Sequence, residues 1–220
     1  MRRSALLAAV LWAFAAWGVA CAGAPSGGDH YLRYTAFRLP GGESVLLRWP
    51  ARRMPLRVHL PAPPDGLFSD PEAVFDTVRD GITDWTDVAA EGVPRFVFVD
   101  EPGSADIPIV WAQEPGGDWY IAYCFWDIDV FQRRFGVAHI VVTARYGDGS
   151  EAPLQDLYAT MLHEMGHALG LRHSPDPRDI MYPRVVEKEP PLLSARDRET
   201  LRLLYARPIG HRVSGAKSAD

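Results

Sequence analysis

One run of eleven residues constrains the fold of this chain more than any other feature. It begins at His163 and reads His-Glu-Met-Gly-His-Ala-Leu-Gly-Leu-Arg-His. On an α-helix, His163 and His167 lie one turn apart on the same face. The residues before and within the run recur with helical spacing and supply an apolar face: Leu154, Leu157, Met161, Leu162, Met165 and Leu169. We therefore predict a helix from about Pro153 to Leu169, ended by Gly170 in a left-handed turn.

The same run contains the side chains needed to bind a metal ion and to use it. Two imidazoles one helical turn apart can each donate a nitrogen to one zinc ion. Once Gly170 turns the chain, His173 can add a third nitrogen and leave the fourth position open, as in catalytic zinc sites. Glu164 lies beside this site and can act as a general base without ligating the metal. A bare His-Glu-x-x-His also occurs on solvated helices, but the extended form is far rarer by chance. We expect one catalytic Zn²⁺ on His163, His167 and His173, with Glu164 as the catalytic base.

The complete pattern of residues 163–173 resembles the signature of the metzincin zinc endopeptidases. Ser174 after the third histidine, and the segment Ile180-Met181-Tyr182-Pro183, resemble the matrixin (peptidase M10) branch of that group. Weaker likenesses extend over about residues 46–207. The resemblance implies a zinc metalloendopeptidase, a hydrolase of bacterial type with an export signal, in which Met181 forms an apolar floor beneath the metal.

The resemblance also implies a substrate pocket. Pro183, Arg184 and Val185 would form a wall of the pocket that receives the residue after the scissile bond. Ala159 would sit where a side chain can limit the depth of that pocket, and its small size suggests an open pocket for an apolar residue. An extended peptide would add to an exposed edge strand within Trp119–Trp126, although we favour a core position for the aromatic residues there.

Two departures from the matrixin pattern concern additional metals. Members of that family use further histidines for a structural zinc, and here only His139 lies in the corresponding region. We therefore expect no second zinc. Three aspartates could serve as calcium ligands: Asp118, Asp127 and Asp129. Scattered carboxylates of this kind are, however, more typical of a solvated surface.

The rest of the chain alternates between strand and helix patterns. Period-two apolar residues predict strands at 56–60, 95–99, 107–111 and 137–143. Asp70-Pro71 is a typical helix start, and Ser194 is a suitable N-cap for a last helix ending near Tyr205. The region 116–135 is aromatic and irregular. We predict an α+β (α/β metzincin-like) domain with a twisted, mostly parallel sheet, an active-site helix, a helix behind the sheet and a C-terminal helix.

We expect residues 46–208 to form the catalytic domain and the segments on either side to lie outside it. Residues 1–24 combine Arg2-Arg3 with a long apolar run, which is typical of an export signal; an uncleaved membrane anchor is the alternative. Gly18-Val19-Ala20-Cys21 resembles the lipobox of bacterial lipoproteins. We therefore expect any attachment to a membrane to occur only through a lipid on Cys21. We expect residues 25–45 to form a linker or loosely docked arm, residues 209–220 a flexible tail, and the mature chain to be secreted or held in the cell envelope.

Composition narrows the function classes. The composition, with 47% apolar and 23% charged residues, is typical of a folded protein. The net charge of −5 argues against nucleic-acid binding. Two cysteines, Cys21 and Cys124, exclude a disulfide scaffold. We expect a monomer whose partner is a protein or peptide substrate. The alternatives are a zinc-binding surface module without turnover and an amide hydrolase that acts on the cell envelope.

Overall fold

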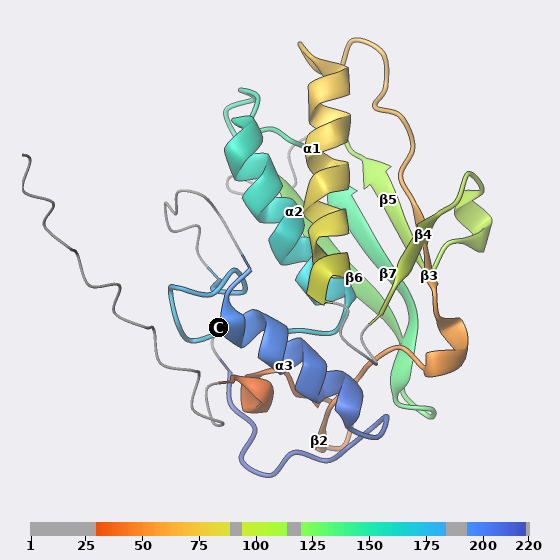
Figure 1. The fold of residues 1–220 in the computed structure, drawn as a ribbon, viewed down its shortest axis with the longest axis vertical. Coiled ribbons are helices and arrows are strands. Elements are labelled where there is room, and N and C mark those ends of the chain that lie inside the picture. Colours follow the sequence, from red (N-terminus) through yellow and green to blue (C-terminus); the bar gives the residue numbers. More distant parts are fainter. Residues whose placement is uncertain (1–29, 89–93, 114–119, 184–192, 219–220) are drawn as a thin grey trace, which may run out of the picture.

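The computed structural model describes residues 30–88, 94–113, 120–183 and 193–218. The predicted export segment with Cys21, the pocket residues Arg184 and Val185, and Asp118 all lie outside these ranges. A five-stranded sheet organises the molecule, in the order β4-β3-β5-β7-β6 (Figure 1). Its strands are β3 (Leu56–His59), β4 (Phe96–Phe98), β5 (Ile107–Trp111), β6 (Ala122–Asp129) and β7 (Arg134–Val142). All neighbours pair in parallel except β6, which is antiparallel to β7 and forms one edge.

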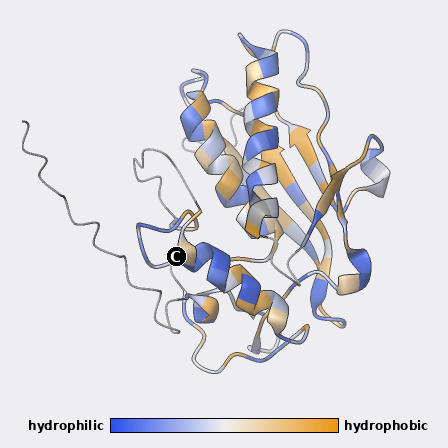
Figure 2. Cartoon of the chain, viewed as in Figure 1, coloured by the Kyte–Doolittle hydropathy of each residue, from blue (hydrophilic) through white to orange (hydrophobic). Residues whose placement is uncertain are grey.

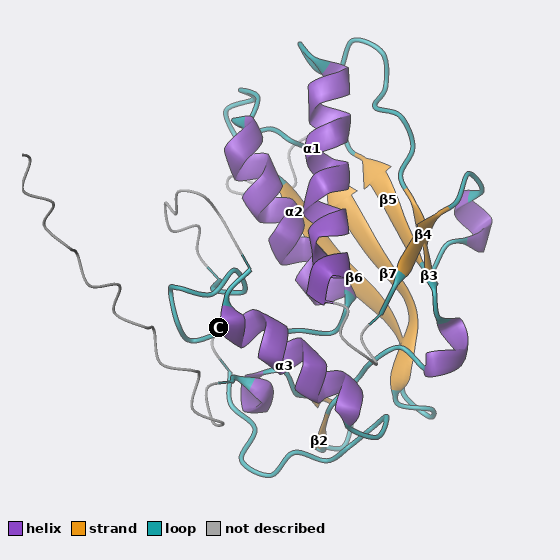
Figure 3. Cartoon of the chain, in the orientation of Figure 1, coloured by secondary structure: helices purple, strands orange, loops and turns teal. Residues whose placement is uncertain are grey.

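Two long helices, α1 (Pro71–Thr83) and α2 (Leu154–Ala168), pack side by side on one face of the sheet (Figure 3). Asp70 caps α1 as predicted, since its side chain accepts the Ala73 N–H at 3.0 Å. Gly81 lets the helices approach closely, because a Cβ there would come within 2.7 Å of the Met161 Cβ. Figure 2 shows that much of the sheet is hydrophobic. The sheet residues that face the helices are fully buried, among them Leu56, Val58, Ile107, Ile109, Ile140 and Val142. The predicted α+β class with a mostly parallel sheet is confirmed.

A second layer lies beneath the lower ends of α1 and α2 (Figure 1). It consists of α3 (Ala195–Ala206), the short strands β1 (Phe37–Arg38) and β2 (Ser44–Val45), and the C-terminal segment. Four short 3-10 helices complete the described elements: η1 (Leu32–Tyr34), η2 (Ala51–Arg53), η3 (Asp84–Val88) and η4 (Pro102–Ser104). The Ser194 side chain and Asp197 form a reciprocal capping box at the start of α3.

The expectation of a loosely docked arm at residues 25–45 is wrong for its described part. Tyr31, Leu32, Phe37, Leu39 and Val45 are buried because they supply apolar surface that packs into the core. The described part of the expected flexible tail is also ordered by backbone bonds, from Leu46 N–H to His211 O (2.8 Å) and from Val213 N–H to Ser44 O (2.9 Å). The described residues 30–45 and 209–218 therefore belong to the folded domain.

The aromatic region at 116–135 is more regular than predicted, because residues 122–129 form strand β6. Its side chains alternate, so Tyr123 and Phe125 point to solvent while Trp126 packs against the core. The core position favoured for these aromatics is thus wrong for Tyr123 and Phe125. Among the described residues, no helix combines the length and apolarity needed to span a bilayer.

Candidate active site

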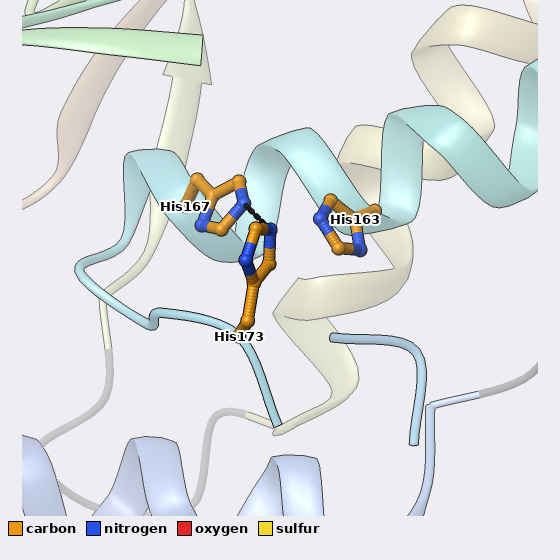
Figure 4. Close-up of side chains that lie close together, drawn as sticks. All are labelled: His163, His167 and His173. Atoms are coloured by element: carbon orange, nitrogen blue, oxygen red, sulfur yellow. Dashed lines mark hydrogen bonds between the residues drawn. The ribbon is translucent and has the colours of Figure 1, made fainter. Parts of the chain in front are cut away.

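Helix α2 and the turn that follows it position the three histidines of the motif. The apolar face of α2 is buried under α1 and the sheet, through Leu157, Met161, Leu162 and Met165. Gly170 then adopts φ +105°, and a Cβ there would lie 2.8 Å from the Leu47 carbonyl oxygen. Only glycine fits both the left-handed backbone and this close approach. The chain consequently turns back and carries His173 toward the helix (Figure 4).

The three imidazoles converge on one point. One nitrogen from each of His163, His167 and His173 lies within 4.8 Å of the other two, and the Nε2 atoms of His167 and His173 are 3.3 Å apart (Figure 4). Tetrahedral ligands at zinc–nitrogen distances of 2.0–2.1 Å are themselves about 3.3 Å apart. The group therefore fits a zinc ion, and in the described part of the chain it is the only cluster of three or more residues that could hold a metal.

Backbone carbonyls orient two of the rings. His163 Nδ1 lies 2.8 Å from the Ile180 carbonyl oxygen, and His167 Nδ1 lies 2.8 Å from that of Leu171. A carbonyl oxygen can only accept, so each Nδ1 carries the proton and each Nε2 keeps its lone pair for a metal. Burial, and then the neighbouring His163, lowers the pKa of His167 well below its usual value. The neutral, metal-binding form of His167 is thus favoured.

Glu164 lies beside this group and is only 8% exposed. Burial raises its pKa to about 8 in the metal-free chain, while a hydrogen bond from the Cys124 backbone acts in the opposite direction. Cys124 belongs to β6, so the Glu164 carboxylate faces the edge strand of the sheet. The Cys124 thiol is unpaired, and burial, with a smaller contribution from Glu164, raises its pKa well above the usual range.

Met181 is fully buried beneath α2. A Cβ at Gly166 would come within 2.3 Å of the Met181 sulfur, so the glycine between the two helical histidines lets Met181 lie directly against the helix. The Met181 carbonyl also accepts the Ser174 N–H at 2.8 Å, which ties this residue to the segment that carries His173. Gly166 was not singled out from the sequence, where it occupies an unspecified position of the motif.

Aromatic side chains from three distant segments hold the C-terminal end of α2. The carbonyl oxygens of His167, Ala168 and Leu169 have no complete set of partners within the helix. They accept hydrogen bonds from Trp126 Nε1 (2.9 Å), Trp49 Nε1 (2.8 Å) and Tyr205 Oη (3.0 Å), respectively. No local sequence signal predicts these partners, because each lies at least 36 residues from its carbonyl.

Only some of the other predicted site residues lie in the described part of the chain. Ala159 is half-buried on α2 and Pro183 is exposed, and the remaining wall of the expected pocket lies outside the described residues. Asp127 pairs with His139 at 3.3 Å, and the Asp129 carboxylate accepts the Gln132 N–H at 2.9 Å. Neither aspartate is gathered with other carboxylates into a described calcium site.

Comparisons with known proteins agree with this geometry. Rat macrophage metalloelastase is 30% identical over 172 residues, covering 74% of this chain and 34% of the relative. Human matrilysin is 35% identical over 115 residues, covering 48% and 42%, and human matrix metalloproteinase-26 is 28% identical over 151 residues, covering 61% and 52%. The chain thus spans between about a third and a half of the length of these relatives. Residues 62–206, well over half of the chain, match the matrixin (peptidase M10) family. The chain belongs to the matrixin family.

Proposed function

We propose that this protein is a zinc-dependent endopeptidase that hydrolyses peptide bonds of extracellular proteins. The observation that carries the proposal is the convergence of three histidine nitrogens within 4.8 Å of one another, beside a buried carboxylate. Membership of the matrixin family supports the same reaction class. His163, His167 and His173 would bind the ion, and Met181 would lie beneath it as an apolar floor.

The chemistry divides between the metal and the protein. Zinc, when bound, polarises a carbonyl oxygen and lowers the pKa of a bound water. Glu164 would take the proton of the attacking water at its carboxylate and deliver it to the departing amine nitrogen. The buried Glu164 carboxyl lies next to the ligand His163 and faces strand β6, so it is placed to carry the proton between the two steps.

The substrate would bind as an extended chain along the free edge of β6. This strand is the last of the sheet in the described part of the chain, and it runs past Glu164. Its outer backbone groups can hydrogen-bond a peptide strand, which selects polypeptides over small amides. Ala159 and Pro183, with Arg184 and Val185, would border a pocket for an apolar side chain after the scissile bond.

We further propose that the protein works outside the cytoplasm. The arginine pair and apolar run of residues 1–24 support export, and Cys21 would carry a lipid if the lipobox-like segment is processed as one. An intact mass of the mature protein would separate free secretion from lipoprotein anchoring, because the processing site and any acyl chains change the mass.

Metal removal and restoration test the proposed reaction. Purified protein is treated with a chelator, dialysed, and assayed on casein and on peptidoglycan before and after one equivalent of zinc. We expect casein cleavage to disappear with the metal and to return with zinc. Zinc binding without cleavage of casein would favour a silent binding module, and release of peptidoglycan fragments alone would favour an envelope amidase; either result overturns the proposal.

A further inference from the structure

A chain of hydrogen bonds connects the N-terminal segment to one of the three site histidines. The Tyr31 hydroxyl donates to Asp197 Oδ1 at 2.7 Å. The other carboxylate oxygen of Asp197 accepts the Ile180 N–H at 2.9 Å. The carbonyl of the same residue, Ile180, accepts from His163 Nδ1 at 2.8 Å. Four residues from the N-terminal segment, α3, the loop before Met181 and α2 are therefore joined in series.

The connection is shielded from solvent. Tyr31 is 1% exposed, Asp197 is fully buried and Ile180 is 8% exposed, so water cannot easily replace a lost partner. Burial, and then the Asp197 carboxylate, raises the pKa of the Tyr31 hydroxyl well above its usual value. The protonated, hydrogen-bond-donating form of Tyr31 is thus favoured.

Asp197 serves the connection as a fixed acceptor. Its Oδ2 accepts the Ser194 N–H at 2.9 Å as well as the Ile180 N–H, while Tyr31 supplies the donor to Oδ1. Tyr31 is itself held on α3, because its N–H donates to Thr200 Oγ1 at 3.1 Å. Loss of the Tyr31 hydroxyl would leave a buried carboxylate oxygen short of its donor, which would loosen the hold of Asp197 on the Ile180 N–H.

We infer that Tyr31 is a positioning residue of the zinc site, which acts through Asp197 and the Ile180 backbone to hold the His163 ring. Tyr31 lies well before residue 62, where the match to the matrixin family begins. The segment that precedes the family match therefore contributes to the geometry of the metal site. The inference rests on the proposed zinc site but not on the proposed peptidase activity.

Tyr31→Phe in the full chain tests the inference, and Tyr146→Phe is its matched control. Both changes remove a tyrosine hydroxyl that donates to an aspartate, but Tyr146 bonds Asp156 in the first turn of α2 and not the Asp197 connection. The zinc dissociation constant is measured by competition with a chromophoric chelator, and the Co²⁺-loaded proteins are compared by visible absorption. We expect about tenfold weaker zinc binding and an altered cobalt spectrum for Tyr31→Phe, with both properties near wild type for Tyr146→Phe.

Two results would overturn the inference. One is a Tyr31→Phe zinc affinity within twofold of wild type, and the other is an equal loss in both variants. If Tyr31→Phe does not fold, Thr200→Val loosens the same segment, and unchanged zinc affinity in that variant also counts against the inference. Normal zinc binding without casein cleavage would contradict the proposed function and leave this inference standing.

Discussion

Two regions of the molecule meet at the site and are stabilised in different ways. We call the described residues within 51–169 the sheet region, and those within 30–49 and 170–218 the terminal region. Apart from Glu164 and His167 of the site, the sheet region buries two polar side chains, Asp106 and Thr143. The terminal region buries five: Thr35, Ser174, Asp179, Asp197 and Thr200. Both regions bury apolar side chains in the common core, but the terminal region adds more buried side chains that are held by directional hydrogen bonds.

This difference assigns separate roles to the two regions. His163 and His167 stand on a helix that apolar packing fixes, whereas His173 and the Ile180 carbonyl come from a loop without regular structure. That loop is held by Asp179, which accepts from Ser174, from Ser194 Oγ (2.7 Å) and from Arg196 Nε (3.1 Å). We conclude that packing in the sheet region mainly sets stability, and that the polar network of the terminal region mainly sets the geometry of the site.

The largest expected effect tests the stability side of this comparison. Ile109 is 1% exposed on β5, which is separated by β7 from β6, the strand beside Glu164. Ile109→Ala should lower the free energy of unfolding by about 2–5 kcal/mol, because it removes buried methyl groups and leaves a cavity. Zinc affinity measured on the folded variant should stay within about twofold of wild type. A tenfold loss of zinc affinity would break the proposed division of roles.

A somewhat smaller effect is expected where the two regions join. Gly170→Ala should cost about 2–3 kcal/mol of unfolding free energy in urea titrations, since the new Cβ meets the Leu47 carbonyl and the backbone is left-handed. Gly149→Ala is the control, because Gly149 also has a positive φ, of +84°, but has open space around its Cβ position. Equal costs for the two variants would show that the contact with Leu47 contributes nothing.

The smallest effect, for a change of one pH unit, concerns the buried carboxyl group of the site. In the folded, metal-free chain burial raises the pKa of Glu164 to about 8, against a usual carboxyl value of 4.5. The contribution of this group to stability is therefore complete below pH 4.5 and is lost as the pH rises through 8. Between these values the unfolding free energy of metal-free Glu164→Gln should gain on that of wild type by about 1.4 kcal/mol per pH unit. His167 titrates in both proteins and cancels in the difference; a difference that does not vary with pH would contradict the burial argument.

Features that depend on neighbours in sequence were predictable. The helix predicted at 153–169 is found at 154–168, the strand predicted at 107–111 has those bounds, and both N-caps are formed by the expected residues. The convergence of the three histidines also follows from local rules, since a helical spacing and one left-handed glycine bring them together.

Features that depend on distant partners were not predictable. The bond from Tyr31 to Asp197 joins residues 166 positions apart, and that from Trp49 to Ala168 joins residues 119 apart. Neither leaves a periodic pattern, so residues 30–45 read as an arm although they form part of the core. The carbonyls that orient the histidine rings, those of Ile180 and Leu171, lie 17 and 4 residues away in sequence. The side chains that hold the surrounding segments come from the distant pairs, so the sequence indicates the ligands but not this support.

Glu164→Gln tests the central claim most directly, with Glu199→Gln as a control on α3, where Glu199 pairs with Arg202 at the surface. Zinc content and casein cleavage are measured on the same purified samples. We predict one zinc per chain in all proteins, wild-type cleavage for Glu199→Gln, and a loss of at least about 100-fold for Glu164→Gln. Cleavage by zinc-loaded Glu164→Gln at a rate near wild type would contradict the account.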